Sequence, residues 1–105
     1  MTRGEAYRVQ LPARRGHEQA ATRHALSVQT DELLGLSTAI VAPTSRSAAP
    51  ATFRPAIQLG GETTRVRIEQ LRALDIERLD QLAGRISARE QQAVDDALAL
   101  VLGLS

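Results

Sequence analysis

The chain has 105 residues, of which 43% are hydrophobic, and its formal net charge is +1. This length suits one domain over residues 1–105, and the hydrophobic content excludes a chain that is disordered throughout. The absence of cysteine excludes disulfides and thiolate metal sites. No apolar run reaches the roughly 18 residues of a membrane span, and the first residues lack the apolar centre of a secretion signal. We therefore expect a cytoplasmic protein that does not associate with a membrane.

The first part of the chain carries the apolar patterns of three strands. Residues 5–11 alternate between two faces, which predicts a half-buried strand. A long polar loop is expected over 13–23, and a second strand over 24–30. The segment 31–36 reads as a turn or a short helical link. Residues 37–44 are almost continuously apolar, which predicts a central third strand.

Proline and glycine divide the next part of the chain. Pro43 is expected at the end of the third strand and not inside it, because proline cannot donate to a sheet ladder. Residues 45–55 are rich in Ser, Ala and Pro and predict a second long loop. Gly60 and Gly61 predict a hairpin turn, and the alternation over 64–70 predicts another strand. We expect about five short strands joined by two loops of roughly ten residues, a length that often carries function.

The end of the chain has the pattern of a helix. Ser87 and Glu90 form a capping-box sequence at its start, and Gly103 is expected to end it. Apolar residues recur at helical spacing at Val94, Ala97, Leu98, Val101 and Leu102. A shorter helix is expected to begin near Asp75. Strands followed by helices indicate an α+β fold, a small curled sheet with a helix packed on it.

The charges are unevenly distributed, and all 13 basic residues are arginine. The net charge is +3 over residues 1–30 and again over residues 44–72, whereas it is −3 over residues 73–105. If the two basic segments share a face, that face suits an anionic ligand, because the arginine fork matches phosphate. The alternative is ordinary solvated charge. Base stacking is nearly unavailable, since Tyr7 and Phe53 are the only aromatic residues.

No metal site is expected, because His17 and His24 are seven positions apart with no third ligand in register. Polar residues that could carry chemistry remain in three groups. They are Glu18, Gln19 and Arg23, then Thr44, Ser45 and Arg46, then Glu69 and Gln70.

If the second and third strands pair antiparallel, Arg23 and Thr44 fall at the same edge of the sheet. There an arginine could stabilise charge on a scissile phosphate, and Glu18 or a hydroxyl could assist proton transfer from a ribose 2′-hydroxyl. The alternative is that Arg23 is a surface arginine, that Thr44 and Ser45 cap a strand, and that Glu69 is an exposed strand residue.

Four segments occur in this order: "GHEQAATR", "AIVAPTSRS", "RIEQLRALDIERL" and "GRISAREQQAVDDALALVLGL". Together they resemble the MazF/PemK family of toxin endoribonucleases. The stretch "GHEQAATR" resembles that family's G-x-E-Q-x-G-x-R-P segment. The stretch "AIVAPTSRS" resembles its third-strand end, which carries a threonine. "RIEQLRALDIERL" and "GRISAREQQAVDDALALVLGL" are similar to its later E-Q segment and its closing helix. The likeness covers essentially the whole chain.

The resemblance implies an SH3-like curled β-barrel of the CcdB/MazF type with a C-terminal α-helix, working as a homodimer. It implies a toxin of a type II toxin–antitoxin system that cleaves single-stranded RNA (mRNA, tRNA or rRNA) at short sequences. It implies 2′,3′-cyclic phosphate and 5′-hydroxyl ends, no cofactor or metal, and a cognate antitoxin as partner.

The family's residue roles carry over to matching positions in this sequence. Arg23 and Thr44 match the catalytic arginine and threonine. The site-shaping or RNA-binding positions are His17, Glu18, Gln19, Ser45, Arg46, Glu69 and Gln70.

The sequence departs from the family pattern at two positions near this site. Ala21 stands where the family usually has glycine, and His24 stands where proline usually follows the arginine. A second hypothesis is therefore a catalytically weakened member that acts by binding, either sequestering an antitoxin or inhibiting gyrase as CcdB does. A third is a structural domain without a site.

Overall fold

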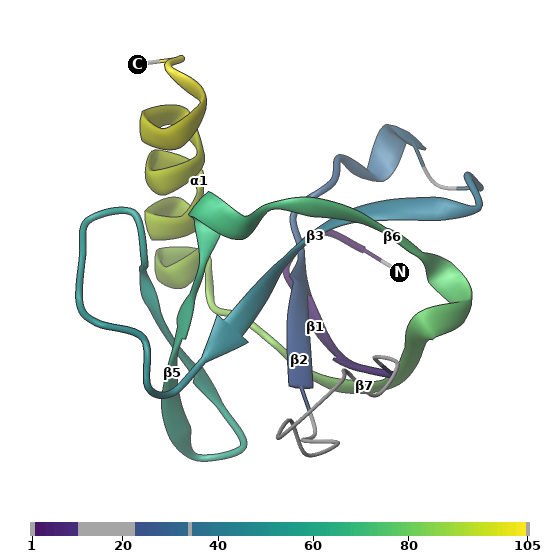
Figure 1. Cartoon of the computed structure of the whole chain (residues 1–105), viewed down its shortest axis with the longest axis horizontal. Helices are drawn as coiled ribbons and strands as arrows, with labels where there is room; N and C mark the ends of the chain where they lie inside the picture. The colour runs from purple at the N-terminus through teal and green to yellow at the C-terminus, as the bar shows by residue number, and fades with distance from the viewer. Residues whose placement is uncertain (1, 11–22, 34, 105) are drawn as a thin grey trace, which may run out of the picture.

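The computed structural model describes residues 2–10, 23–33 and 35–104. They form an antiparallel sheet that curls into a half-barrel, with one α-helix standing beside it (Figure 1). The strand order is β4-β5-β3-β2-β1-β7, and β6 pairs with β3. The strands are β1 (Glu5–Val9), β2 (Arg23–Ser27), β3 (Thr38–Ser45), β4 (Ala56–Leu59), β5 (Glu62–Val66), β6 (Arg72–Asp75) and β7 (Leu79–Arg85). The helices are α1 (Ala88–Leu102) and the short 3₁₀ helices η1 (Asp31–Leu33), η2 (Ile68–Gln70) and η3 (Ile76–Arg78). The predicted curled barrel with a C-terminal helix is confirmed.

Strand β3 is central, as its continuous apolar pattern predicts. Its first half pairs with β6 and its last two residues pair with β5, while its other edge pairs with β2. Alternate residues of β2 enter two different core clusters, because successive side chains point to opposite faces. Leu26 lies in the helix-side cluster with Ala42 and Val94, and Ala25 lies in the barrel cluster with Val41. Burial on both faces fixes the register of β2 against β3.

Helix α1 begins and ends as its sequence predicts. The Ser87 hydroxyl accepts from the Glu90 N–H at 3.1 Å, and the Glu90 carboxylate accepts from the Ser87 N–H at 2.8 Å. Gly103 closes the helix in the left-handed conformation, with φ of 70°. The apolar stripe is only partly buried, since the side chains of its last turn, Val101 and Leu102, are exposed.

The helix predicted near Asp75 is wrong. The chain forms the single turn η3 there, in which the Asp75 carboxylate accepts from the Glu77 N–H, and then continues as strand β7. Leu79 pairs with Val9 of β1, at the other end of the chain. This long-range pairing overrides the local helical spacing. It also raises the number of strands above the expected five.

The expected position of Pro43 is also wrong, because Pro43 lies inside β3. Its carbonyl accepts from the Arg67 N–H at 2.8 Å, at the point where the partner of β3 changes from β6 to β5. The missing proline N–H therefore falls at a junction and interrupts no continuous ladder. Strand β5 ends at Val66, before the end of the predicted 64–70, because Ile68–Gln70 forms the turn η2.

Candidate active site

A cleft of about 650 Å³ opens where β2 begins and β3 ends, beside the β4–β5 hairpin. One wall comes from the ends of β2 and β3 and from the residues that follow β3. The other wall comes from the hairpin, whose Gly60 and Gly61 both have positive φ in a tight turn. The described residues that line the cleft are Arg23, His24, Thr44, Ser45, Arg46, Ser47, Leu59, Glu62 and Thr64.

The register of β2 against β3 places Thr44 beside His24. Ala25 pairs with Pro43, so the next antiparallel pair joins His24 and Thr44. The Thr44 hydroxyl donates to the His24 carbonyl at 3.3 Å, which holds the two strand ends together. Because side chains alternate along a strand, both residues share the face of Leu26. The antiparallel pairing that the sequence predicts is confirmed, and Arg23 and Thr44 line the same cleft.

Arginine dominates the charge of the cleft. Arg23 is exposed, and within the described part of the chain it forms no salt bridge. Arg46 pairs with Glu62 across the cleft, and both side chains remain more than half exposed. An exposed ion pair contributes at most about 1 kcal/mol, so an anion such as phosphate can compete for Arg46. Guanidinium groups beside hydroxyls suit a phosphodiester, since both donate to its oxygens.

The other predicted residues divide into two sets. His17, Glu18 and Gln19 lie outside the described residues. Glu69 and Gln70 are described but do not line the cleft. The Arg54 guanidinium donates to the Glu69 carboxylate at 2.8 Å and holds the pKa of Glu69 below its usual range. Arg54 also donates to the Ala49 carbonyl at 3.1 Å, so this pair braces the loop that follows Arg46.

The hairpin wall of the cleft, with Leu59, Glu62 and Thr64, was missed by the sequence reasoning. The Gly-Gly turn predicts the hairpin, but its position beside the end of β3 depends on the long-range pairing of Thr44 with Val66. Among the sequence patterns, only the net positive charge of residues 44–72 indicated that this segment shares a site with Arg23.

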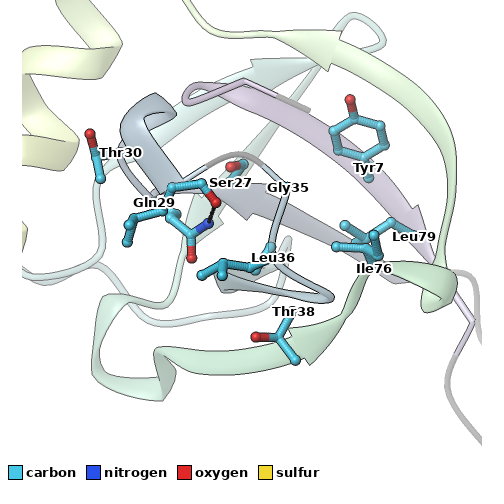
Figure 2. Close-up of a pocket in the computed structure, with 11 residues that line it drawn as sticks. Tyr7, Ser27, Gln29, Thr30, Gly35, Leu36, Thr38, Ile76 and Leu79 are labelled. Atoms are coloured by element: carbon cyan, nitrogen blue, oxygen red, sulfur yellow. Dashed lines mark hydrogen bonds between the residues drawn. The ribbon is translucent and has the colours of Figure 1, made fainter.

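A second cavity, of about 330 Å³, lies between β1, β3 and the η1 and η3 turns (Figure 2). Figure 2 shows Tyr7, Leu36, Ile76 and Leu79 around it, with the polar side chains of Gln29 and Thr38 at its rim. None of the described residues that line it is charged. An anionic ligand therefore finds a cationic partner in the first cleft and not in this one.

Besides Glu69, two further carboxylates with lowered pKa values, Glu5 and Asp95, lie outside the cleft and are structural. The backbone N–H of Thr2 donates to Glu5 at 2.6 Å and is the main reason that the pKa of Glu5 lies below its ordinary value. Arg85 adds an ion pair to Glu5 at 2.7 Å. Burial raises the pKa of Asp95, but the Arg3 guanidinium at 2.5 Å and a second hydrogen bond leave it lowered. These pairs tie the N-terminus to β7 and α1.

The described residues hold no group of three His, Cys, Asp or Glu side chains arranged to bind a metal ion. Within the same ranges, no helix is long and apolar enough to cross a membrane.

Comparison with known proteins identifies the family. The model of PemK-like, MazF-like toxins of type II toxin–antitoxin systems matches residues 2–102. The chain belongs to this family. A candidate toxin of Mycobacterium tuberculosis is 38% identical over 104 residues, covering 97% of both chains. The endoribonuclease MazF9 of the same organism is 35% identical over 117 residues, covering 99% of this chain and 98% of its own.

Solved structures agree with the MazF-like fold. An endoribonuclease of a mycobacterial species, determined in complex with its cognate antitoxin, superposes with a TM-score of 0.83. The match covers 100% of this chain and 97% of that one at 18% identity. At this identity the likeness concerns the fold, including the curled sheet and the closing helix.

Proposed function

We propose that this chain is a toxin that cleaves single-stranded RNA as an endoribonuclease, without a metal ion. The observation that carries the proposal is that Arg23 and Thr44 line one cleft. Membership of the MazF-like family and the similarity to the endoribonuclease MazF9 support it. The family model spans 2–102, which supports one toxin domain over the chain.

The proposed reaction is attack of a ribose 2′-oxygen on the adjacent phosphorus. A bond forms between the 2′-oxygen and phosphorus while the bond from phosphorus to the 5′-oxygen breaks. The products are a 2′,3′-cyclic phosphate and a 5′-hydroxyl. Arg23 stabilises the charge that grows on the phosphate oxygens, because a fixed cation acts where that charge develops. Thr44 adds a hydroxyl donor once it leaves the His24 carbonyl.

The remaining predicted residues take supporting roles in the proposal. Ser45 and Arg46 contact the RNA backbone beside the scissile phosphate. His17, Glu18 and Gln19 shape the site from the 13–23 segment. Glu69 acts through Arg54 by holding the loop after Arg46, and no contact of Gln70 indicates its role.

We further propose two protein partners. The family's toxin–antitoxin description supports a cognate antitoxin, whose binding over the arginine-lined cleft would block RNA. A homodimer is supported by exposed apolar side chains at the end of α1, where Leu102 and Leu104 face a groove with Leu33 and Ile40. Light scattering at micromolar concentration tests the dimer, and a protein that is only monomeric would contradict it. We propose the cytoplasm as the place of action, a location that the two proposed partners, RNA and an antitoxin, support.

Cleavage of total RNA by the purified protein and two variants tests the proposed function. Arg23→Ala removes a guanidinium from the cleft, whereas Arg89→Ala removes one from the exposed start of α1. We expect discrete fragments with the wild type and with Arg89→Ala, and almost none with Arg23→Ala. Equal cleavage by all three proteins would remove Arg23 from the site. Intact RNA with a folded wild type would favour the alternative, a family member that acts by binding.

A further inference from the structure

His24 is the second residue of β2. It lines the cleft and neighbours Thr44 on the same face of the sheet. Directly opposite residues on neighbouring strands have Cβ atoms about 4.5–5.5 Å apart, so the imidazole lies within reach of a group held by Thr44. The half-buried side chain retains access to solvent and to a ligand. The family that this sequence resembles usually has proline here, so the imidazole is a feature of this chain.

Few of the described lining residues can take up a proton. Arginine stays protonated, and a serine or threonine hydroxyl does not act as a base at neutral pH. Only His24 and Glu62 remain among the described lining residues. Glu62 stands on the hairpin wall and is held by Arg46. Imidazole is the side chain that most often transfers protons near neutral pH, and His24 lies beside the residues that hold the phosphate.

The charged groups around His24 come from each neighbouring element. Arg8 of β1 is its direct cross-strand partner, and Arg23 precedes it on β2. Arg46 follows β3, and Glu62 comes from the hairpin. Among these described groups, two guanidinium groups and one carboxylate line the cleft with His24, and Arg8 pairs with it across the strands. The excess of positive charge favours binding of a phosphodiester beside the histidine.

We propose that His24 is the general base of the cleavage reaction, an inference that rests on the proposed function. The imidazole nitrogen accepts the proton of the 2′-hydroxyl as the 2′-oxygen forms its bond to phosphorus. The bond from phosphorus to the 5′-oxygen breaks, and the 5′-oxygen takes a proton from solvent or from a second group. The imidazolium returns its proton to solvent, so His24 is unchanged after each turnover.

The test is the pH dependence of single-turnover cleavage of a defined RNA by His24→Gln. Glutamine can hydrogen-bond but cannot transfer a proton at neutral pH. The wild-type rate should show a limb that rises with pH, because only an unprotonated base can accept the proton of the 2′-hydroxyl. The His24→Gln variant should lack this limb, and its cleavage rate should be lower than that of the wild type by about 100-fold or more. The variants Glu62→Gln and Glu18→Gln remove the carboxylates that could act as the base instead. Both variants should keep the limb in the pH dependence of the rate.

Two further readouts separate a proton-transfer role from a structural one. An RNA with a 2′-deoxy group at the scissile position cannot be cut, and His24→Gln should bind it as tightly as the wild type does. An RNA with a 5′-bridging sulfur has a leaving group that needs no general acid, so the His24→Gln defect should persist on it. Rescue on the sulfur substrate would show that His24 is the acid, which overturns its assignment as the base.

The remaining outcomes are also decisive. A pH limb that survives in His24→Gln, or that disappears in Glu18→Gln instead, overturns the assignment while leaving the proposed function intact. RNA left intact by the wild type would overturn both. If His24→Gln binds RNA more weakly but cleaves bound RNA at the wild-type rate, His24 has a binding role only. This result would also overturn the assignment of His24 as the base.

Discussion

Thr44→Val is the substitution that best separates the structural role of Thr44 from its proposed catalytic one. The structure shows one described hydrogen bond of this hydroxyl, to the His24 carbonyl at 3.3 Å. A neutral hydrogen bond contributes about 0.5–1.5 kcal/mol to stability, and this one is long. Valine keeps the β-branched shape that suits a strand. The free energy of unfolding should therefore fall by less than about 1.5 kcal/mol.

The expected loss of activity is larger. Removing one hydrogen-bond donor from a developing oxyanion costs about 100- to 1,000-fold in rate, or roughly 2.7–4 kcal/mol. Thr44→Ser is the matched control, because it keeps the hydroxyl and loses only the methyl group. We expect Thr44→Ser to stay within about tenfold of the wild-type rate, which corresponds to about 1.4 kcal/mol.

Single-turnover cleavage of an RNA oligonucleotide by excess protein measures the rate, and urea unfolding measures stability. A Thr44→Val rate within about threefold of the wild type, a difference of about 0.7 kcal/mol, would refute the proposed role of the hydroxyl. A rate loss accompanied by unfolding of the variant would refute the claim that the structural role is small.

Two other predictions concern charge. Glu62→Gln releases Arg46 for contact with phosphate. The slope of the logarithm of RNA affinity against the logarithm of salt concentration should therefore become more negative by about 0.7. Fluorescence anisotropy with uncleavable RNA measures this slope, and an unchanged slope would show that Arg46 does not contact RNA. Because the pKa of Glu5 is lowered in the fold, its contribution to stability is complete above the ordinary value of 4.5 and is lost as pH falls through the folded pKa. The stability difference between wild type and Glu5→Gln should thus shrink below pH 4.5, as measured by urea unfolding, and a constant difference would contradict this linkage.

Features set by neighbouring residues could be predicted from the sequence. The capping box of Ser87 and Glu90 and the turn at Gly60 and Gly61 involve only a few consecutive residues. The continuous apolar character of β3 predicts its central place, because a strand buried on both faces needs apolar residues at every position.

Features set by distant pairing could not be predicted in the same way. The helix expected to begin near Asp75 does not form, and residues 79–85 form β7 instead, because β1 offers a partner strand. Glu69 is a predicted site residue by motif, and the sequence does not indicate that its carboxylate accepts a hydrogen bond from Arg54. The place of Glu62 in the cleft depends on the β3–β5 pairing.

The candidate site shows the same division. Arg23 and Thr44 could be brought together from the sequence, because a short link predicts antiparallel pairing of β2 and β3. The proposed role of His24 could not be predicted from the sequence, because its position beside Thr44 depends on the register of β2 against β3. One residue of slip would turn the imidazole to the other face of the sheet.

The most direct test of the central claim is the chemistry of the RNA ends made in the presence of EDTA. The purified protein is incubated with total RNA, and new 5′-hydroxyl ends are mapped by sequencing beside the Arg23→Ala variant. Discrete cut sites with 5′-hydroxyl and 2′,3′-cyclic phosphate ends, absent with Arg23→Ala, are the predicted result. Cuts that need a divalent metal or leave 5′-phosphates, or no cuts by a folded wild type, would contradict metal-independent cleavage at the Arg23–Thr44 cleft.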